Sequence, residues 1–316
     1  MRDFIGQNDF TWFIGVVEDR NDPLQLGRVR VRCYGWHTDD KNQIPTEALP
    51  WAVQLQGITS PALNGMGQSP TGLVEGSWIV GFFLDGERAQ EPLILGSIAS
   101  APSEYGDPKK GFFDPREAKE NQSIYPKYIN ETDVNRLARH NTTDPETKEK
   151  IHSTNPVFNT AKDKDATLDV PIANSSDTWS ELKTTDISKP GVTRYNTKYP
   201  KNHVYESESG HTVEFDDTEN AERINEHHKS GTFYEIDADG NKVTRIVGNN
   251  YEIVAKNNNV NIKGDVNLTI DSNCNTYIKK DWNIQVDGNV NEVIKGNKTT
   301  QITGNLDIDA ERIDLN

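Results

Sequence analysis

Cysteine is almost absent from this chain: Cys33 and Cys274 are the only two among 316 residues, and they lie in regions of different character. Neither a disulfide framework nor a thiolate metal site can be built from them. Long apolar runs are missing too. Asp3, Asn8 and Asp9 interrupt the apolar residues at the N-terminus, and no later segment reaches the length of a membrane span. We therefore expect neither a signal peptide nor a membrane anchor.

Positive charge is also scarce. The chain has 34 Lys and Arg against 49 Asp and Glu, which gives a formal net charge of -15. A phosphate backbone requires a basic surface, so this balance argues against a nucleic-acid partner. At 33% hydrophobic residues the chain is unusually polar for its length. Such a chain can be stable when the apolar faces of its strands are buried against identical partners, and we expect an oligomer.

What the chain does contain is an eight-residue repeat over residues 240–316. Ten marked positions stand eight apart, most of them Gly or a basic residue, and nearly every mark is followed by Asn or Asp. The residue two before a mark is mostly β-branched. Gly-Asn and Gly-Asp suit positive φ at a tight corner, and alternating β-branched residues suit a strand with one buried face. The fixed period predicts short strands joined by corners, a repeat architecture. The corner glycines are Gly240, Gly248, Gly264, Gly288, Gly296 and Gly304.

One face of each octad strand is apolar. Side chains at plus two, plus four and plus six from a mark share a face, because side chains alternate along a strand, and the opposite face is nearly all polar. We predict that the apolar face forms an interior, which includes Ile262, Ile270, Ile278, Trp282, Val286, Ile294 and Ile302.

Glu292 and Lys298, in neighbouring octads near the distal end, break this apolar pattern. Glu292 stands at plus four of its octad and Lys298 at plus two of the next. A buried charge needs a partner or water, so we predict that the two pair across chains or line a wet segment. The alternative is that both turn outward at a local irregularity.

The octads allow two windings, a one-chain solenoid or three chains around a common axis. Solenoids of one chain usually need longer coils to enclose a core, whereas an octad can form one side of a triangular prism when three chains share the sides. Each octad would then climb one strand spacing, so that ten octads give a rod on the order of 45 Å long. A chain in such a rod has no stable core alone, which makes the trimer obligatory.

Residues 1–100 predict an all-β domain. Apolar or alternating runs occupy residues 10–17, 28–34, 51–55, 77–84 and 92–98, and five strands fit a small barrel. In the second run Arg28, Arg30 and Arg32 share one face. We expect that face to be solvated and the opposite one, with Val29, Val31 and Cys33, to pack in the core; an anion site is the alternative for the arginines.

Composition divides the chain into four segments. These are a barrel domain at 1–100, an extended connector with little regular structure at 101–192, a β-rich lead-in at 193–239 and the octad repeats at 240–316. The connector loses periodicity, although short helices are possible near residues 115–121 and 132–140. In an assembly, a connector of this length can be ordered by a neighbouring subunit.

Few side chains suggest catalysis or metal binding. The candidates are an acid/base pair of Asp216 and Asp217, and the metal ligands His211, His227 and His228. Neighbours in a strand point to opposite faces, so neither adjacent pair converges easily. Residues 237–240 resemble the start of a calcium loop without its later ligands, and residues 296–300 lack the spacing of a phosphate loop. We expect no cofactor, no metal and no enzymatic activity.

Several stretches resemble one family of proteins. Residues 195–218 resemble the lead-in to the spike of contractile-tail hub proteins, which are the central spikes of T-even-type phage baseplates and the related valine-glycine repeat proteins of type VI secretion. Residues 27–31, 75–83 and 92–97 resemble the oligonucleotide/oligosaccharide-binding (OB) barrel of those proteins, and residues 125–139 resemble their connector. The resemblance implies a homotrimer with three OB barrels on the tail hub and an intertwined, triangular β-helix directed at the host cell.

The chain departs from that family in two ways. Phage members often carry a lysozyme domain between barrel and helix, but the segment between Ile98 and Tyr199 is too short for one and shows no convincing acidic pair. The secretion relatives carry a hub domain before the barrel, which here begins at once. We therefore expect the N-terminal barrel to dock on a separate hub protein. Because no His-x-His motif closes the chain, we expect a small tip protein to cap the C-terminal end.

The resulting prediction is a non-enzymatic central spike in the tail baseplate of a virion, or in an equivalent extracellular injection particle. It would contact and pierce the host outer membrane transiently when the sheath contracts. Strands bonded between chains would supply its stiffness. Two alternatives stay open: a tail-associated, lysozyme-like cell-wall hydrolase with its site in the connector, and a one-chain solenoid adhesin that recognises surface glycans.

Overall fold

The computed structural model describes residues 10–116, 129–141, 170–173, 175–179 and 195–314. Most of the predicted connector, including most of 115–121, lies outside them. Within this part of the chain the regular structure is β apart from two short 3-10 helices, η2 (Thr46–Ala48) and η3 (Gly86–Arg88). The helix predicted near 132–140 is wrong, because residues 136–140 form a turn. No helix among the described residues is long and apolar enough to cross a bilayer.

Five strands near the N-terminus close into a barrel in the order β1-β2-β3-β5-β4. They are β1 (Trp12–Asp19), β2 (Val29–Cys33), β3 (Trp51–Gln54), β4 (Trp78–Phe83) and β5 (Pro92–Ser97). Each overlaps one of the five runs that the sequence predicts, and only β3 and β5 pair in parallel. Alternate side chains point inward and form one core, which includes Phe13, Val17, Val29, Val31, Cys33, Ile79, Phe83 and Ile94.

Arg32 corrects the prediction of a solvated arginine face on β2. Its side chain is fully buried, as is that of Glu18, whose Oε1 accepts a hydrogen bond from Arg32 Nε at 2.6 Å. The two terminal guanidinium nitrogens donate to the carbonyls of Thr38 and Ile44, each at 2.7 Å. A buried guanidinium is tolerated only with this degree of pairing. The other two arginines of the face are partly exposed.

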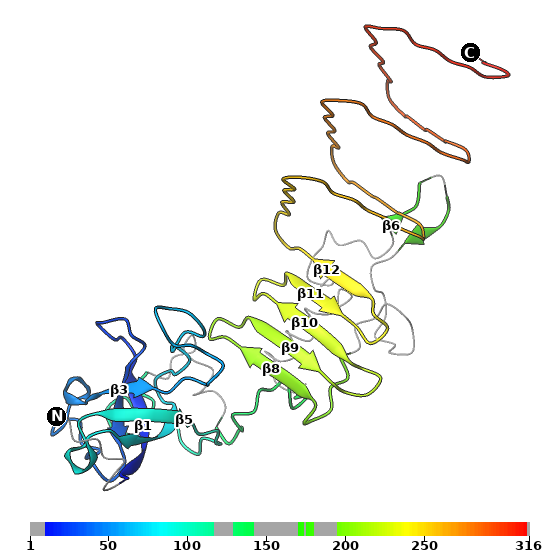
Figure 1. Cartoon of the computed structure of the whole chain (residues 1–316). Helices are drawn as coiled ribbons and strands as arrows, with labels where there is room; N and C mark the ends of the chain where they lie inside the picture. Colours follow the sequence, from blue (N-terminus) through cyan, green and yellow to red (C-terminus); the bar gives the residue numbers. More distant parts are fainter. Residues whose placement is uncertain (1–9, 117–128, 142–169, 174, 180–194, 315–316) are drawn as a thin grey trace.

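A second sheet, which we call the lead-in sheet, has five antiparallel strands in chain order. They are β8 (Asn202–Glu206), β9 (Thr212–Asp216), β10 (Arg223–His227), β11 (Phe233–Ile236) and β12 (Lys242–Arg245). Three of the connecting turns contain a glycine with positive φ: Gly210, Gly231 and Gly240. Figure 1 shows this sheet between the barrel and the octads. A separate small hairpin pairs β6 (Val170–Pro171) with β7 (Thr178–Trp179).

The octad segment bends at a regular interval but forms no paired strand within described residues 246–314. Backbone bends fall at 247–248, 255–256, 263–264, 271–272, 279–280, 287–288, 295–296, 303–304 and 311. Each lies at a predicted mark or directly before one, so the backbone follows the eight-residue period. Figure 1 shows the segment rising from the lead-in sheet in wide turns.

The corner glycines do not use the special backbone freedom of glycine, with one exception. Only Gly240 has a φ in the left-handed region, +79°. The expectation of positive φ is wrong for Gly248, Gly264, Gly288, Gly296 and Gly304. A Cβ at these five positions would meet no atom within 4 Å in the single chain. The same corner can therefore hold Lys, Ser or Arg at the other marks.

Candidate assembly interfaces

One face of the lead-in sheet is buried within the chain and is mostly polar. At its centre Arg223, with a fully buried side chain, donates to Glu214 Oε2 at 2.6 Å and to Glu235 Oε2 at 3.1 Å. The amides of Asn202 and Asn225 donate to the same two carboxylates at 2.8 and 3.1 Å. Each acid therefore accepts from the central guanidinium and from one amide, which compensates for its burial.

The neighbouring carboxylates favour the charged form of Arg223. Burial by itself would lower the pKa of Arg223, but the carboxylates of Glu214 and Glu235 outweigh it and raise the pKa. The Arg223 guanidinium also lies 4.8 Å from the ring centroid of Tyr195, whose hydroxyl donates to the carbonyl of Leu137 at 2.7 Å. Burial, followed by the charge of Glu214, raises the pKa of Tyr195. The network thus fastens the segment before β8 onto the sheet.

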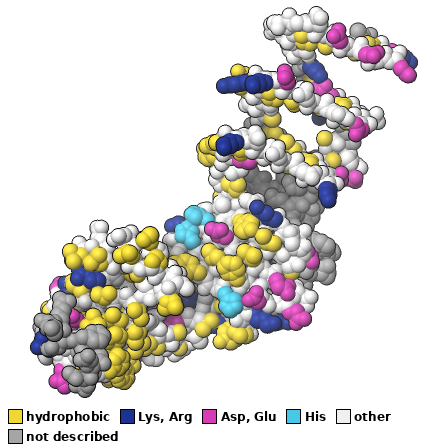
Figure 2. All heavy atoms as spheres, in the orientation of Figure 1, with side chains coloured by type: hydrophobic (Ala, Val, Ile, Leu, Met, Phe, Trp, Pro, Cys, Tyr) yellow, Lys and Arg dark blue, Asp and Glu magenta, His cyan; other side chains and the backbone are white. Residues whose placement is uncertain are grey.

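The opposite face of the lead-in sheet is open and rich in apolar side chains. Strand register places Phe215, Ile224 and Ile236 in one row across β9, β10 and β11, with Tyr205 opposite Val213 two residues along. Tyr205 is 70% exposed and Phe215 52%. Figure 2 shows hydrophobic side chains on the surface of this part of the molecule. An antiparallel sheet normally buries its apolar face, so this inversion marks an interaction surface.

Two side-chain contacts identify the concave side of the octad bends. The Lys298 ammonium pairs with the Glu292 carboxylate, and the Asn258 amide donates to Glu252 Oε1 at 3.2 Å. In both, the acid stands at plus four of one octad and its partner at plus two of the next, with a bend between them. Side chains on the outside of a bend diverge, so these positions lie on the inside.

These contacts refine the prediction for the polar exceptions. Glu292 and Lys298 pair within one chain, and their burial inside an assembly stays a prediction. Sequence reasoning missed the second pair, Glu252 with Asn258, although its identical spacing was a signal that could have revealed it.

The apolar positions of the octads are open to solvent in the single chain. Predicted interior residues at plus six range in exposure from 43% for Ile278 to 54% for Ile262, and Trp282 at plus two is 71% exposed. The other members of the predicted interior, Ile270, Val286, Ile294 and Ile302, fall within the plus-six range. Figure 2 shows open space between successive turns of the segment. One chain therefore leaves an apolar strip open to solvent.

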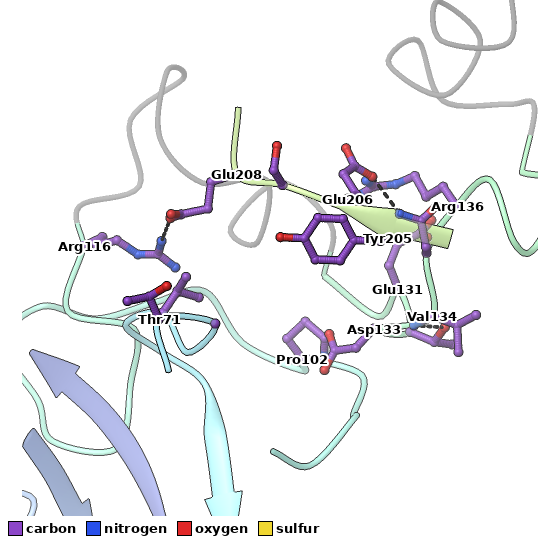
Figure 3. Close-up of a pocket in the computed structure, with 15 residues that line it drawn as sticks. Thr71, Pro102, Arg116, Glu131, Asp133, Val134, Arg136, Tyr205, Glu206 and Glu208 are labelled. Carbon is purple, nitrogen blue, oxygen red and sulfur yellow. Dashed lines mark hydrogen bonds and ion pairs between the residues drawn. The ribbon is translucent and has the colours of Figure 1, made fainter. Parts of the chain in front are cut away.

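A charged junction joins the barrel to the lead-in sheet. Glu208, in the turn after β8, accepts from the two terminal nitrogens of Arg20 at 2.8 and 3.0 Å. Arg116 Nη1 lies 3.9 Å from the same carboxylate and is itself held by Asp114 and by the carbonyl of Glu75. Figure 3 shows Arg116 and Glu208 pointing toward each other beside a cavity of about 630 Å³.

The carboxylates around this cavity are held in hydrogen bonds and ion pairs, an arrangement that does not suit acid–base catalysis. The hydrogen bond from Arg20 lowers the pKa of Glu208, with Arg116 adding to the effect, whereas a general acid needs a raised pKa. Glu131 pairs with Arg139, and Glu206 Oε2 accepts from Asn135 Nδ2 at 2.6 Å. The arrangement is that of a structural joint.

Replacing Glu208 with Gln should loosen the junction without unfolding either part. Because the Glu208 side chain is 57% exposed, we expect little change in the unfolding midpoint. The maximum dimension in small-angle X-ray scattering and the rate of limited proteolysis should both increase.

The pKa of Glu208 is lowered, so the ion pair is complete above the ordinary carboxyl pKa of about 4.3 and is lost as pH falls through the lower folded value. Acid should thus reproduce the effect in the unaltered chain. Glu222→Gln is the matched control, and identical scattering of all three proteins would refute the junction.

The residues considered for metal or acid–base chemistry are not brought together. Asp216 is buried and Asp217 exposed, as alternation predicts, and His227 and His228 divide in the same way. The rings of His211 and His228 lie 4.4 Å apart, but the Nδ1 atom of each accepts a backbone N–H. Within the described ranges, no group of three or more His, Cys, Asp or Glu side chains could hold a metal ion.

Comparison with known proteins agrees with the barrel fold. The family model for the Gp5 N-terminal OB domain matches residues 35–190. Protein Gp5 of Vibrio phage KVP40 is 42% identical over 281 residues, which cover 84% of this chain and 65% of that protein. The pre-baseplate central spike protein Gp5 of Enterobacteria phage T4 is 47% identical over 113 residues, 34% of this chain and 20% of that protein. The matches thus span less than two thirds of either relative. They confirm the predicted all-β fold with an N-terminal OB barrel.

Proposed function

We propose that this chain is a structural spike of a phage tail baseplate, because it is similar to protein Gp5 of Vibrio phage KVP40 and to the pre-baseplate central spike protein Gp5 of Enterobacteria phage T4. The similarity confirms the resemblance found in the sequence. The barrel, the lead-in sheet and the octads follow one another along an elongated molecule. The observation that carries the proposal is the apolar strip of the octads, whose predicted interior residues are 43% to 71% exposed in the single chain and require a covering partner.

In the proposed spike three copies wind around one axis and cover this strip for one another. Adjacent strands of a sheet lie about 4.8 Å apart, so a three-chain winding leaves room for two foreign strands between successive turns of one chain. The open space between turns in Figure 2 supports that arrangement. A one-chain solenoid would instead pair its own coils, and the described octads contain no such pairing. The apolar face of the lead-in sheet would turn toward the same axis.

The proposed role is mechanical. Each octad strand would bond to strands of the other two chains, so unwinding one chain means breaking backbone bonds to both, which gives kinetic resistance under load. The N-terminal barrel would dock on a separate hub protein and a small tip protein would cap the C-terminal end. On contraction the spike would transmit force to the host outer membrane. It needs no nucleic acid and no cofactor.

Alkylation of the two cysteines should distinguish the inside of this spike from its surface. Cys33 is buried in the barrel, and burial raises the pKa of its thiol to about 12, so it should not react with iodoacetamide at pH 8. Cys274 is exposed in the single chain but stands at plus two of its octad, so assembly should protect it. Mass spectrometry should find neither thiol labelled in the native particle and both labelled in urea. Native labelling of Cys274 at the rate of a free thiol would refute its interior position.

The proposal also predicts no cell-wall hydrolysis. The purified chain should leave a peptidoglycan suspension turbid, with lysozyme as the positive control. Clearing by the chain that disappears in Glu131→Gln, a carboxylate of the junction cavity, would favour the hydrolase alternative.

A further inference from the structure

The octads resemble one another so closely that they leave the alignment of three wound chains open. The backbone bends follow one eight-residue interval, so a chain that slips by one octad against its partners keeps its strand spacing. Its apolar contacts change little as well, because the residue at plus six is Ile or Val in eight successive octads. Alignment in such a repeat needs side chains that differ from one octad to the next.

Charged residues supply such a difference at two places on the inner face. Over residues 250–310, the positions at plus two, plus four and plus six carry three charged side chains, Glu252, Glu292 and Lys298. Each acid is held by the residue six positions later, across a bend. The Lys298 ammonium pairs with Glu292, and the Asn258 amide donates to Glu252 at 3.2 Å. Each pair therefore forms a polar level, by which we mean a polar layer across the proposed interior, between mostly apolar ones.

The contact within one chain leaves bonding capacity unused in Glu292 and Lys298. In the single chain their side chains are 56% and 57% exposed. An ammonium has several N–H donors and a carboxylate has two acceptor oxygens, so one contact satisfies neither group fully. Solvent can meet the remaining donors and acceptors while the chain is alone. Once the interior closes, only polar groups of other copies at the same level can do so, and burial without them is costly.

We infer that the two polar levels align the three copies, and that the level built by three copies of Glu292 and Lys298 is the main determinant. The inference rests on the proposed three-chain winding and specifies how its copies recognise their correct alignment. In alignment, the pair of each copy meets the same pair of the other two. After a slip of one octad toward the lead-in sheet, Glu292 would instead stand level with Ile284 and Lys298 with Val290. Their unused donors and acceptors would then be buried without partners.

The other polar level strengthens this discrimination. Glu252 and Asn258 precede Glu292 and Lys298 by the same five octads, so one slip misaligns both levels together. Buried polar residues fix the alignment of coiled coils in the same way, at some cost in stability.

The test moves the main polar level by one octad in the full-length chain. The shifted chain carries Ile284→Glu, Val290→Lys, Glu292→Leu and Lys298→Leu, with leucine as other octads have it at Leu268 and Leu306. By itself it should form trimers, because its three pairs still meet at one level. Expressed together with the unaltered chain, under tags of different mass, it should form separate trimers. Native mass spectrometry should find mixed trimers at least about tenfold below the share of about three quarters that random mixing gives.

The matched control carries Asn283→Glu and Asn289→Lys. These changes add the same charges at the same six-residue spacing, but at plus three and plus one, outside the interior positions. This chain should mix freely with the unaltered one.

Each outcome decides for or against the inference. Separate trimers of the shifted chain, beside free mixing of the control, support it. Free mixing of the shifted chain overturns it and leaves the spike intact, and so does sorting by the control as well. A shifted chain that stays monomeric by itself also overturns it, because a pair that only aligns copies should work at either level. An unaltered chain that is monomeric defeats the proposed function together with the inference.

Discussion

Aspartate in place of Ile270 will leave the chain monomeric while its barrel remains folded. Ile270 stands at plus six of an octad whose interior face also carries Val266 and Leu268. In a three-chain winding, the three copies of Ile270, one from each chain, would face the common axis. A carboxylate without a partner in such a position destabilises by roughly 4 kcal/mol per chain. The combined destabilisation from three copies is too large for a rod whose only core is this interior. The trimer should therefore not form, and sedimentation should show the mass of one chain.

Asn267→Asp is the control for this substitution. It adds the same charge in the same octad, but on the polar face at plus three, which the winding leaves in solvent. This variant should assemble as the unaltered chain does. If both variants have the same mass in solution, the two faces of the octad are equivalent and the interior assignment is wrong.

The second large effect is expected at Arg223. Methionine there would leave the carboxylates of Glu214 and Glu235 buried without their shared cation, which destabilises by about 3–5 kcal/mol. Urea unfolding of the lead-in sheet, followed by circular dichroism, should shift to a clearly lower midpoint. Arg223→Lys should recover only part of the loss, because one ammonium cannot donate to both acids from the separate positions of Nη1 and Nη2.

Removing the two acids together provides the matching test. In a chain that carries Arg223→Met, the added changes Glu214→Gln and Glu235→Gln remove the unpaired charges while nearly keeping side-chain shape. Much of the lost stability should return. If Arg223→Met alone leaves the urea midpoint unchanged, the buried network does not stabilise the sheet.

The sequence predicted the parts of this fold that follow local periodicity. The five barrel strands were visible because alternating apolar residues such as Phe13, Val31 and Ile79 form one inner face. The bends of the octad segment follow the eight-residue spacing of the marks. In both cases neighbouring residues along the chain carry the signal, and no distant contact is needed to interpret it.

What the sequence did not predict depends on partners far apart in the chain. Arg32 looked like a solvated arginine because Glu18, which neutralises it inside the barrel, lies on another strand. The lead-in sheet has the usual alternation, but pairing of Arg223 with acids on the two neighbouring strands buries the polar face and leaves Phe215 open. The Glu208 junction joins residues separated by 188 positions. The sequence pattern around a residue does not reveal a contact with a partner elsewhere in the chain.

The central claim is that three copies of this chain share one interior, and the mass of the purified protein in solution tests it most directly. Light scattering coupled to size-exclusion chromatography should give three times the 35.5 kDa of one chain, without change on dilution through the micromolar range. A stable particle with the mass of a single chain and folded octads would contradict the claim and favour a one-chain solenoid.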